Sequence, residues 1–340
     1  MSGGVDSSVA AALMLRQGYE CAGLTLKLHK HESAKCSQDQ NDAREAALKL
    51  GIPHSVLDIT EEFEKQVICR FVEIYEDGAT PNPCVICNRY IKFNFLLQSL
   101  QNDFNCFATG HYARVEKDPA GGRYLLKKAV DEKKDQSYVL YNLTQEQLQY
   151  ACFPLGGFSK GEVRKIAKEI NFENAEKGES QDICFVPHGD YGDFIESFTG
   201  RPAMPGDILD TGGRVLGRHR GIIRCTIGQR RGLGVAANTP VYVAAKSAET
   251  NTVTLGPEES LYSKSLIAND INLVTCSEIK KPMRVMVKTR YLQSAQSALA
   301  EQVGEDSLHI EFDAPQRAIT PGQAAVMYDG DIVIGGGTII

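Results

Sequence analysis

The chain has 340 residues, of which 42% are hydrophobic and 24% charged, the balance of an ordinary globular protein with two or three domains. No apolar run approaches the ~18 residues of a membrane span, no signal peptide pattern precedes the first motif, and ten scattered cysteines suit a reducing compartment. We therefore expect a cytoplasmic protein without a membrane partner. The formal net charge of −6 argues against broad, nonspecific nucleic-acid binding.

A phosphate-binding loop begins at residue 2, with the sequence Ser2-Gly3-Gly4-Val5-Asp6-Ser7-Ser8. Two glycines let the backbone turn tightly against an anion, and Ser or Asp side chains can cap a helix that starts near Ser7. The loop lacks the Lys of the commoner G-x-x-x-x-G-K-[ST] loop. It resembles instead the pyrophosphate loop of enzymes that split ATP into AMP and pyrophosphate. Only Met1 precedes it, so the strand expected to carry the loop is missing.

Helices and strands alternate through the first third of the chain. Apolar periodicity predicts helices over residues 9–16, 39–50, 63–75 and 91–100, and strands over residues 20–28, 55–59 and 106–108. This alternation predicts an α/β fold with a doubly wound parallel sheet. Ligands of such sheets lie at the carboxyl ends of the strands, where we expect both the Ser2 loop and Gly110.

The rest of the chain changes from helical to β-rich. Ser159 and Glu162 fit a capping box before a helix over residues 163–170. Beyond residue 206, short β-rich runs alternate with turns, and Asp329-Gly330 is a strong hairpin signal. We expect a catalytic domain with a helical extension over residues 1–200, a small β domain over 201–268 and a C-terminal β-barrel over 272–340.

Basic residues cluster in three stretches despite the acidic total. Six arginines and no acidic residue lie between Arg214 and Arg231, and the other stretches run over residues 280–290 and 127–134. A solvent-exposed face would explain a single basic run equally well, but three runs together favour a surface that binds RNA.

Two cysteine neighbourhoods carry possible chemistry, Pro83-Cys84-Val85-Ile86-Cys87 and the segment around Cys184. Pro83 suits the first position of a helix, which would place Cys84 and Cys87 at the positive end of the dipole, where thiolates are favoured. A lone C-x-x-C is weak support for a site, because a structural zinc site needs a second pair. Buried, unreactive cysteines remain the alternative on these residues alone.

A set of ordered motifs resembles the tRNA-specific 2-thiouridylase family over nearly the whole chain. Besides the Ser2 loop, it comprises Asn82-Pro83, Cys87-Asn88, Ile91-Lys92-Phe93, Thr109-Gly110-His111-Tyr112, Lys134-Asp135-Gln136-Ser137-Tyr138, Cys184-Phe185, Gly228-Gln229-Arg230-Arg231-Gly232-Leu233-Gly234, Lys288-Thr289-Arg290-Tyr291 and Thr320-Pro321-Gly322-Gln323.

The resemblance implies a tRNA 2-thiouridine synthase. Its substrate is a tRNA with a modifiable wobble uridine, whose C2 oxygen is adenylated by ATP and then replaced by sulfur from a protein persulfide. By family position Cys184 carries the persulfide and Cys87 attacks it, and a cysteine desulfurase or a sulfur-relay protein supplies the sulfur. Glu179 and Asp182 oppose thiolate formation at Cys184, so we expect a compensating positive group nearby.

Binding residues follow from the same family positions. ATP is expected at Ser2, Gly3, Gly4, Val5, Asp6, Ser7, Leu26 and Gly110. Asp6 is expected either to contact Mg²⁺ or to cap the helix. The expected tRNA contacts are His111, Lys134, Asp135, Gln136, Arg290, Tyr291 and Gln323, with Asn82, Pro83 and Cys84 at the extruded target base.

One departure from the family pattern is Cys84, where many relatives have an Asp with an acid or base role. A thiol substitutes poorly for a carboxylate at neutral pH, so that role passes to another group or is lost. The change also creates a set of three cysteines, Cys84, Cys87 and Cys184. A 4Fe-4S cluster held by these three is a second hypothesis.

Two other functions remain as alternatives. An ATP-pyrophosphatase ligase that forms an amide on a small molecule would share the loop but needs neither paired cysteines nor basic stretches. A non-catalytic RNA-binding protein would explain the basic stretches but not the loop. Finally, relatives place a strand before the loop, so we expect the true start of the gene about ten residues upstream of Met1.

Overall fold

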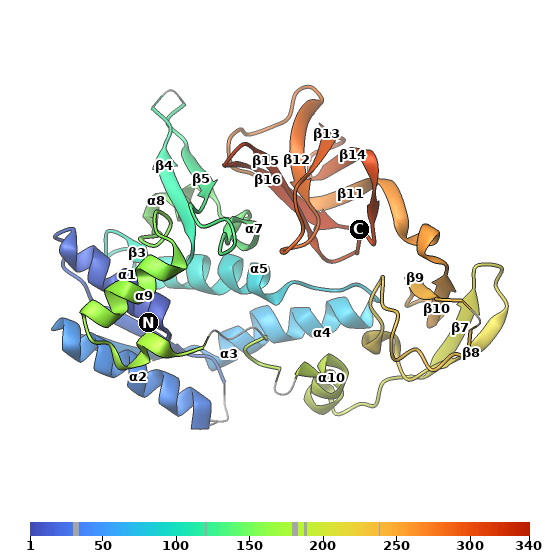
Figure 1. Ribbon diagram of the computed structural model, residues 1–340, viewed down its shortest axis with the longest axis horizontal. Coiled ribbons are helices and arrows are strands. Elements are labelled where there is room, and N and C mark those ends of the chain that lie inside the picture. Colours follow the sequence, from blue (N-terminus) through green and yellow to red (C-terminus); the bar gives the residue numbers. More distant parts are fainter. Residues whose placement is uncertain (30–33, 120, 179–182, 187–188, 238) are drawn as a thin grey trace.

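The computed structural model describes residues 1–340 except 30–33, 120, 179–182, 187–188 and 238. An α/β domain, a small β domain and a C-terminal barrel follow one another along the chain (Figure 1). In the described parts of the chain, no helix combines the length and the apolar character needed to cross a membrane.

The α/β domain contains the parallel strands that the sequence predicts. Helices α1 (Val5–Arg16) and α2 (Ala34–Leu50) alternate with strands β1 (Gly23–Lys27) and β2 (His54–Asp58), which pair in parallel. A second parallel pair joins β3 (Phe107–Ala108) to β6 (Ala151–Cys152). Among the described residues, these two parallel pairs form two separate two-stranded sheets. Met1 lies against β1, where Thr25 Oγ1 donates to its carbonyl at 2.7 Å.

Two long helices of this domain each contain a π-helical segment. The first runs through α3 (Thr60–Phe63), η1 (Glu64–Ile68) and α4 (Cys69–Glu76), and its middle part is π-helical. The second runs through α5 (Pro83–Cys87), the π-helical η2 (Asn88–Phe95) and α6 (Leu96–Leu100). The sequence predicts ordinary helices here. A π-helix bonds i to i+5, so it brings side chains five residues apart onto one side.

The remaining helical elements of the first domain are short. Ser159 and Glu162 form the predicted capping box at the start of α9. These elements and their bounds are α7 (Ser137–Leu140), α8 (Gln145–Tyr150), α9 (Lys160–Glu169), η3 (Glu173–Glu176) and α10 (Tyr191–Thr199).

A small β domain follows α10. Its strands β7 (Gly206–Asp210), β8 (Val215–His219), β9 (Tyr242–Ser247) and β10 (Thr252–Gly256) form one sheet in the order β8-β7-β10-β9. Short helical turns η5 (Ile222–Arg224) and η6 (Glu258–Leu261) flank it.

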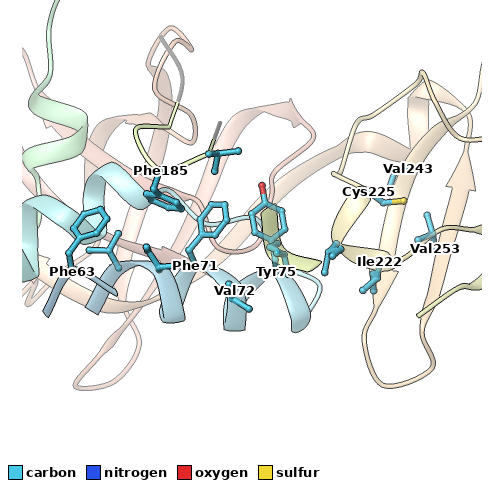
Figure 2. Packing of buried hydrophobic residues seen from close by; sticks show 14 of the residues in the cluster. Phe63, Phe71, Val72, Tyr75, Phe185, Ile222, Cys225, Val243 and Val253 are labelled. Atoms are coloured by element: carbon cyan, nitrogen blue, oxygen red, sulfur yellow. The ribbon is translucent and has the colours of Figure 1, made fainter. Parts of the chain in front are cut away.

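One hydrophobic cluster joins the first two domains (Figure 2). Phe63 and Phe71 of the first long helix pack with Phe185, the residue after Cys184, at ring-centroid distances of 5.8 and 5.1 Å. The same cluster continues to Ile222 and Val253 of the small β domain. The segment that carries Cys184 is therefore anchored by its aromatic neighbour against the helix and the second domain.

The C-terminal barrel closes because β11 pairs with both β14 and β16. Its strands are β11 (Tyr262–Leu273), β12 (Met283–Lys288), β13 (Gln296–Gln302), β14 (Ser307–Arg317), β15 (Ala324–Asp329) and β16 (Ile332–Ile339). Gly330, with φ 58°, makes the predicted turn between β15 and β16. The predicted domain boundary at residues 268–272 falls inside β11, whose pairing lies within the barrel, so the barrel begins before that boundary.

A hairpin of the first domain extends the barrel sheet. Strands β4 (Ala113–Lys117) and β5 (Tyr124–Lys128) pair with each other, and Lys127 of β5 pairs with Ile332 of β16. Arg114 of β4 also forms an ion pair of 2.6 Å with Asp331. The catalytic domain and the barrel are thus joined by backbone as well as by side chains.

Candidate active site

Helix α1 begins directly from the glycine loop. Gly4 is the N-cap, with extended backbone (φ −89°, ψ 157°) and without a side-chain cap among the described residues, so the predicted Ser or Asp cap is wrong. Ser7 Oγ instead donates to the Gly4 carbonyl at 3.0 Å and accepts from the backbone N–H of Ser2 at 3.1 Å. A helix start without a side-chain cap keeps its N–H groups available to an anion, as a phosphate site requires.

Gly3 is required by the close approach of helix α2. Its φ of 71° lies in the left-handed region, and a Cβ there would be 2.1 Å from the backbone oxygen of Asp39. Any other residue would therefore have to displace α2. This contact places the acidic residues Asp39 and Asp42 of α2 beside the loop.

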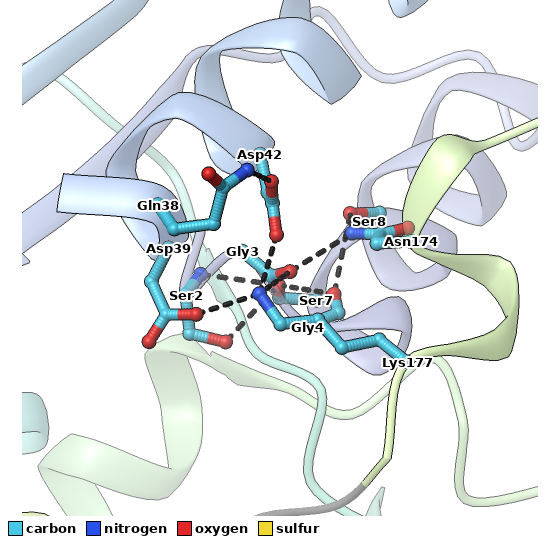
Figure 3. A network of polar contacts seen from close by, with 10 residues as sticks. All are labelled: Ser2, Gly3, Gly4, Ser7, Ser8, Gln38, Asp39, Asp42, Asn174 and Lys177. Carbon is cyan, nitrogen blue, oxygen red and sulfur yellow. Dashed lines mark hydrogen bonds and ion pairs between the residues drawn. The ribbon is translucent and has the colours of Figure 1, made fainter. Parts of the chain in front are cut away.

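A polar network connects the loop, α2 and the segment after η3 (Figure 3). Asn174 Nδ2 donates to the Gly3 carbonyl at 3.0 Å and to Ser8 Oγ at 3.3 Å. Lys177 Nζ lies 2.6 Å from Asp39 Oδ1 and also contacts the Asp42 carboxylate. The loop is thus held from two sides by residues that the sequence alone did not single out.

Asp6 lies in the first turn of α1 and forms a charged cluster with Lys160 and Tyr112. Lys160 Nζ lies 2.8 Å from each carboxylate oxygen, and the Tyr112 hydroxyl donates to Oδ1 at 2.8 Å. Asp6 is therefore not a helix cap. Because a lysine ammonium already occupies both oxygens, the carboxylate fits a direct Mg²⁺ contact poorly in this arrangement.

Gly110, two residues beyond the end of β3, lies directly beside the loop and the start of α1. A Cβ on Gly110 would be 2.8 Å from the backbone nitrogen of Ser7 and 2.9 Å from the carbonyl carbon of Asp6. Only glycine lets the strand end pass this close to the start of α1. Leu26, also a predicted ATP contact, packs its side chain against the cluster of Phe63 and Phe71.

The fold packs Cys87 and the two neighbours of Cys184, Ile183 and Phe185, into the same hydrophobic cluster. Helix α5 starts as expected, with Pro83 in the first turn and the Asn82 side chain accepting from Val85 N at 3.3 Å. Cys84 on this helix is exposed, and Cys87 is half-buried. The Cys184 residue is exposed, but partial desolvation of its thiol, with smaller contributions from Cys87 and Cys84, raises its pKa to about 12. The thiols of Cys87 and Cys184 therefore lie within electrostatic reach of each other.

Lys92 is the positive group expected near these thiols. Burial raises the pKa of Cys87, and the Lys92 charge acts against this shift, as it does at Cys184. Lys92 follows Cys87 by five residues, and Cys87 directly precedes the π-helical segment η2 that contains Lys92. Ordinary helical periodicity would pair Cys87 with residue 90 or 91. Lys92 could be identified from the sequence because it lies in the family motif Ile91-Lys92-Phe93. Nothing in the sequence indicated that its charge would act on the two cysteines. Glu179 and Asp182, expected to oppose the thiolate, lie outside the described residues.

His111 connects the cysteine site to the loop. It follows Gly110, its Nδ1 is 2.8 Å from Thr109 Oγ1, and its ring contacts Phe93 of η2. Burial and the Lys92 charge hold the pKa of His111 well below its usual value, so the imidazole is neutral at physiological pH.

Several predicted tRNA-contact residues make structural contacts within the chain. The buried Asp135 carboxylate accepts from Ala129 N and Ser137 N, both at 3.1 Å, and Gln136 Oε1 accepts from Tyr112 N at 2.9 Å. Arg290 donates to Ala318 O at 2.7 Å, and Gln323 Nε2 donates to Thr80 O at 2.8 Å. Gln323 thus fastens the barrel to the segment that precedes Asn82 and the cysteine helix.

The two other predicted contacts differ in their surroundings. Tyr291 packs against the buried ring of Tyr138 at a centroid distance of 6.0 Å. Lys134 is half-exposed beside Asp135. Two of the predicted tRNA residues, Tyr291 and Gln323, thus join the barrel to the first domain, and Lys134 is a partly exposed cation.

The described residues contain no group of three His, Cys, Asp or Glu side chains arranged to hold a metal ion. Cys84, Cys87 and Cys184 thus do not fit the hypothesis of a 4Fe-4S cluster in this arrangement.

Fold and site together define an α/β nucleotide-binding protein with two appended β domains. The tRNA methyl transferase HUP domain family matches residues 1–188, its PRC-barrel domain residues 192–257 and the aminomethyltransferase beta-barrel domain residues 263–339.

The chain belongs to the tRNA-specific 2-thiouridylase family. It is 49% identical to the tRNA-specific 2-thiouridylase MnmA of Acetivibrio thermocellus, over 100% of this chain and 97% of that one. The enzyme of the same name from Clostridioides difficile is 47% identical, over 100% and 96%. Among solved structures, NMN synthetase from Francisella tularensis covers 60% of this chain and 76% of its own, with 18% identity and a TM-score of 0.32.

Proposed function

We propose that this protein is a tRNA 2-thiouridine synthase, a sulfurtransferase that uses ATP. It replaces the C2 oxygen of a wobble uridine with sulfur and releases AMP and pyrophosphate. Family membership over the full length of the chain supports the reaction class. The observation that carries the proposal is the packing of Cys87 in one cluster with Ile183 and Phe185, the two neighbours of Cys184. The charge of Lys92 acts on both thiols, and Gly110, beside His111, adjoins the nucleotide loop.

In the first step, the C2 oxygen of uridine attacks the α-phosphorus of ATP, and pyrophosphate leaves. The glycine loop and the start of α1 offer backbone N–H groups and the positive end of a helix dipole to the phosphates. Adenylation turns the C2 oxygen into a good leaving group. Mg²⁺ would accompany the phosphates as their counterion, and no residue is assigned to it here.

In the second step, the terminal sulfur of a Cys184 persulfide attacks C2, and AMP leaves with the original oxygen. The Cys87 thiolate then attacks Sγ of Cys184, which breaks the sulfur–sulfur bond to the substrate and leaves the transferred sulfur on C2. The product state holds a Cys87–Cys184 disulfide, which a dithiol reductant must reduce before the next turnover. Lys92 favours the Cys87 thiolate that makes the second attack, and the Cys184 thiolate that accepts the sulfur when the persulfide is loaded.

The partners follow from this chemistry. A cysteine desulfurase or a relay protein would load Cys184, and we place the reaction in the cytoplasm, where tRNA, ATP and these donors meet. Exposed Arg220, Arg230 and Arg231 of the small β domain are available to tRNA phosphates.

Reconstitution with purified components tests the proposal. The protein is incubated with ATP, an unmodified tRNA and a persulfide donor, and pyrophosphate and 2-thiouridine are measured together. We expect both products only when all three components are present. Pyrophosphate release that needs an amino acid or ammonia and no tRNA would replace the proposal with an amide ligase. Binding of tRNA without any ATP turnover would indicate an RNA-binding protein.

A further inference from the structure

Lys177 lies against the nucleotide loop but belongs to none of the motifs assigned to ATP. It follows η3, whose Asn174 is hydrogen-bonded to Gly3 and Ser8 of the loop. The Lys177 ammonium is 3.5 Å from the Gly3 carbonyl oxygen, and its side chain is about one-third exposed (30%). It can therefore reach a phosphate seated on the loop without a change of fold.

The side chains that hold Lys177 leave a negative local charge. One ammonium faces two carboxylates, those of Asp39 and Asp42, and Gln38 Nε2 donates to Asp42 Oδ1 at 2.6 Å. Burial works to raise the pKa of Asp42, but the hydrogen bonds from Lys177 and Gln38 and the Lys177 charge lower it, so both partners are ionised. If the cluster kept these contacts, its net negative charge would repel an approaching polyphosphate.

The position of α2 keeps this negative charge close to the loop. The backbone oxygen of Asp39 occupies the space beside Gly3, so the backbone that carries both aspartates cannot withdraw without moving the helix. The group that can change partners is the long, partly exposed lysine side chain. Ammonium-to-phosphate hydrogen bonds are charge-assisted and stronger than neutral ones.

We propose that Lys177 is a ligand of the pyrophosphate part of ATP, held by Asp39 and Asp42 when the loop is empty and transferred to the phosphates when ATP binds. This inference rests on the proposed use of ATP. Lys177 would supply the positive charge that the loop motif, which contains no lysine, does not provide.

Binding measurements separate this role from a structural one. Affinities for α,β-methylene-ATP, which cannot be split between the α and β phosphorus atoms, and for AMP are measured by calorimetry in the wild type, Lys177→Met and Lys177→Arg. We expect Lys177→Met to bind the analogue at least about tenfold more weakly and AMP within about twofold of wild type. Lys177→Arg should recover part of the loss, since it keeps the charge.

Two further variants test the inference independently of Lys177→Met, in case that variant folds poorly. Asp39→Asn with Asp42→Asn frees the ammonium, and we expect tighter analogue binding than in the wild type. Lys49 lies on α2 with Asp39 and Asp42 but donates to the Asn171 carbonyl. Lys49→Met is therefore the matched control, and it should bind the analogue as tightly as the wild type does.

Three results would overturn the inference. One is analogue binding by Lys177→Met equal to wild type, and another is an equal loss for AMP and the analogue. The third is weaker analogue binding after both aspartates are neutralised. A wild-type protein that binds no analogue at all would instead refute the proposed use of ATP, and the inference with it.

Discussion

Lys160 binds both carboxylate oxygens of Asp6, with its ammonium nitrogen 2.8 Å from each. The lysine starts α9, the aspartate lies in the first turn of α1, and both are largely buried, with 11% and 29% of their side chains exposed. The pair joins the nucleotide loop to a helix far along the chain. It also explains why Asp6 does not cap its own helix.

Removal of this pair tests its contribution to stability. In Lys160→Met, the Asp6 carboxylate keeps only the Tyr112 hydroxyl, so we expect the free energy of unfolding to fall by about 1.5–3 kcal/mol. Denaturant unfolding measures the change, and Lys165→Met on the exposed side of α9 should change it by less than about 0.5 kcal/mol. Adding Asp6→Asn to Lys160→Met should cost less than the sum of the single changes; strict additivity would show that the two residues are not coupled.

The cysteine roles can be tested separately from substrate binding. We expect Cys184→Ser to abolish 2-thiouridine formation, because no persulfide can form, while tRNA affinity stays within about twofold of wild type. Cys87→Ser should still accept sulfur on Cys184 and attack C2, but it cannot release the product. With ATP and tRNA present, a protein–tRNA adduct linked through Cys184 should therefore accumulate, and a dithiol reductant should release it. Cys276→Ser, in the barrel, is the control. Normal thiolation by Cys184→Ser would refute the mechanism.

Lys92 should control the reactivity of both thiols. Its positive charge lowers the pKa of Cys87 and Cys184 against the effect of burial, so Lys92→Met should raise both values further. Less thiolate is then present near pH 8, and we expect alkylation by iodoacetamide to slow by about threefold to tenfold, since one pKa unit is a tenfold change in thiolate. Peptide mass spectrometry follows each cysteine, and Lys92→Arg should react almost as the wild type does. Unchanged rates in Lys92→Met would remove the assigned role.

His111 should make stability depend on pH in the mildly acidic range. Burial holds its folded pKa well below the usual 6.5, so stability is fully present above pH 6.5 and falls as the unfolded chain takes up a proton below that value. His111→Gln should therefore reduce the loss of unfolding free energy on acidification, measured by denaturant titration at several pH values. His29 and His54 have lowered pKa values as well, so some dependence should remain. An unchanged slope would show that His111 is not buried in the neutral form.

Local patterns in the sequence predicted the elements that depend on neighbours along the chain. The capping box of Ser159 and Glu162 and the turn at Gly330 formed as expected, because each needs only a few adjacent residues. The helical period also located the first long helix through Phe63 and Phe71. It did not predict the π-helical segments, because a widened turn depends on packing around the helix and leaves no strong mark in residue spacing.

The sequence by itself determined the family, the loop, the two candidate catalytic cysteines and the order of α/β and β domains, because motifs and periodicity are properties of short segments. Only the tertiary structure showed that Lys160 holds Asp6, that Lys177 bridges Asp39 and Asp42, and that Gln323 fastens the barrel to Thr80. Each of these contacts joins residues far apart in the chain. A charged or polar side chain acquires its partner only when packing brings distant segments together, and no local pattern encodes that choice.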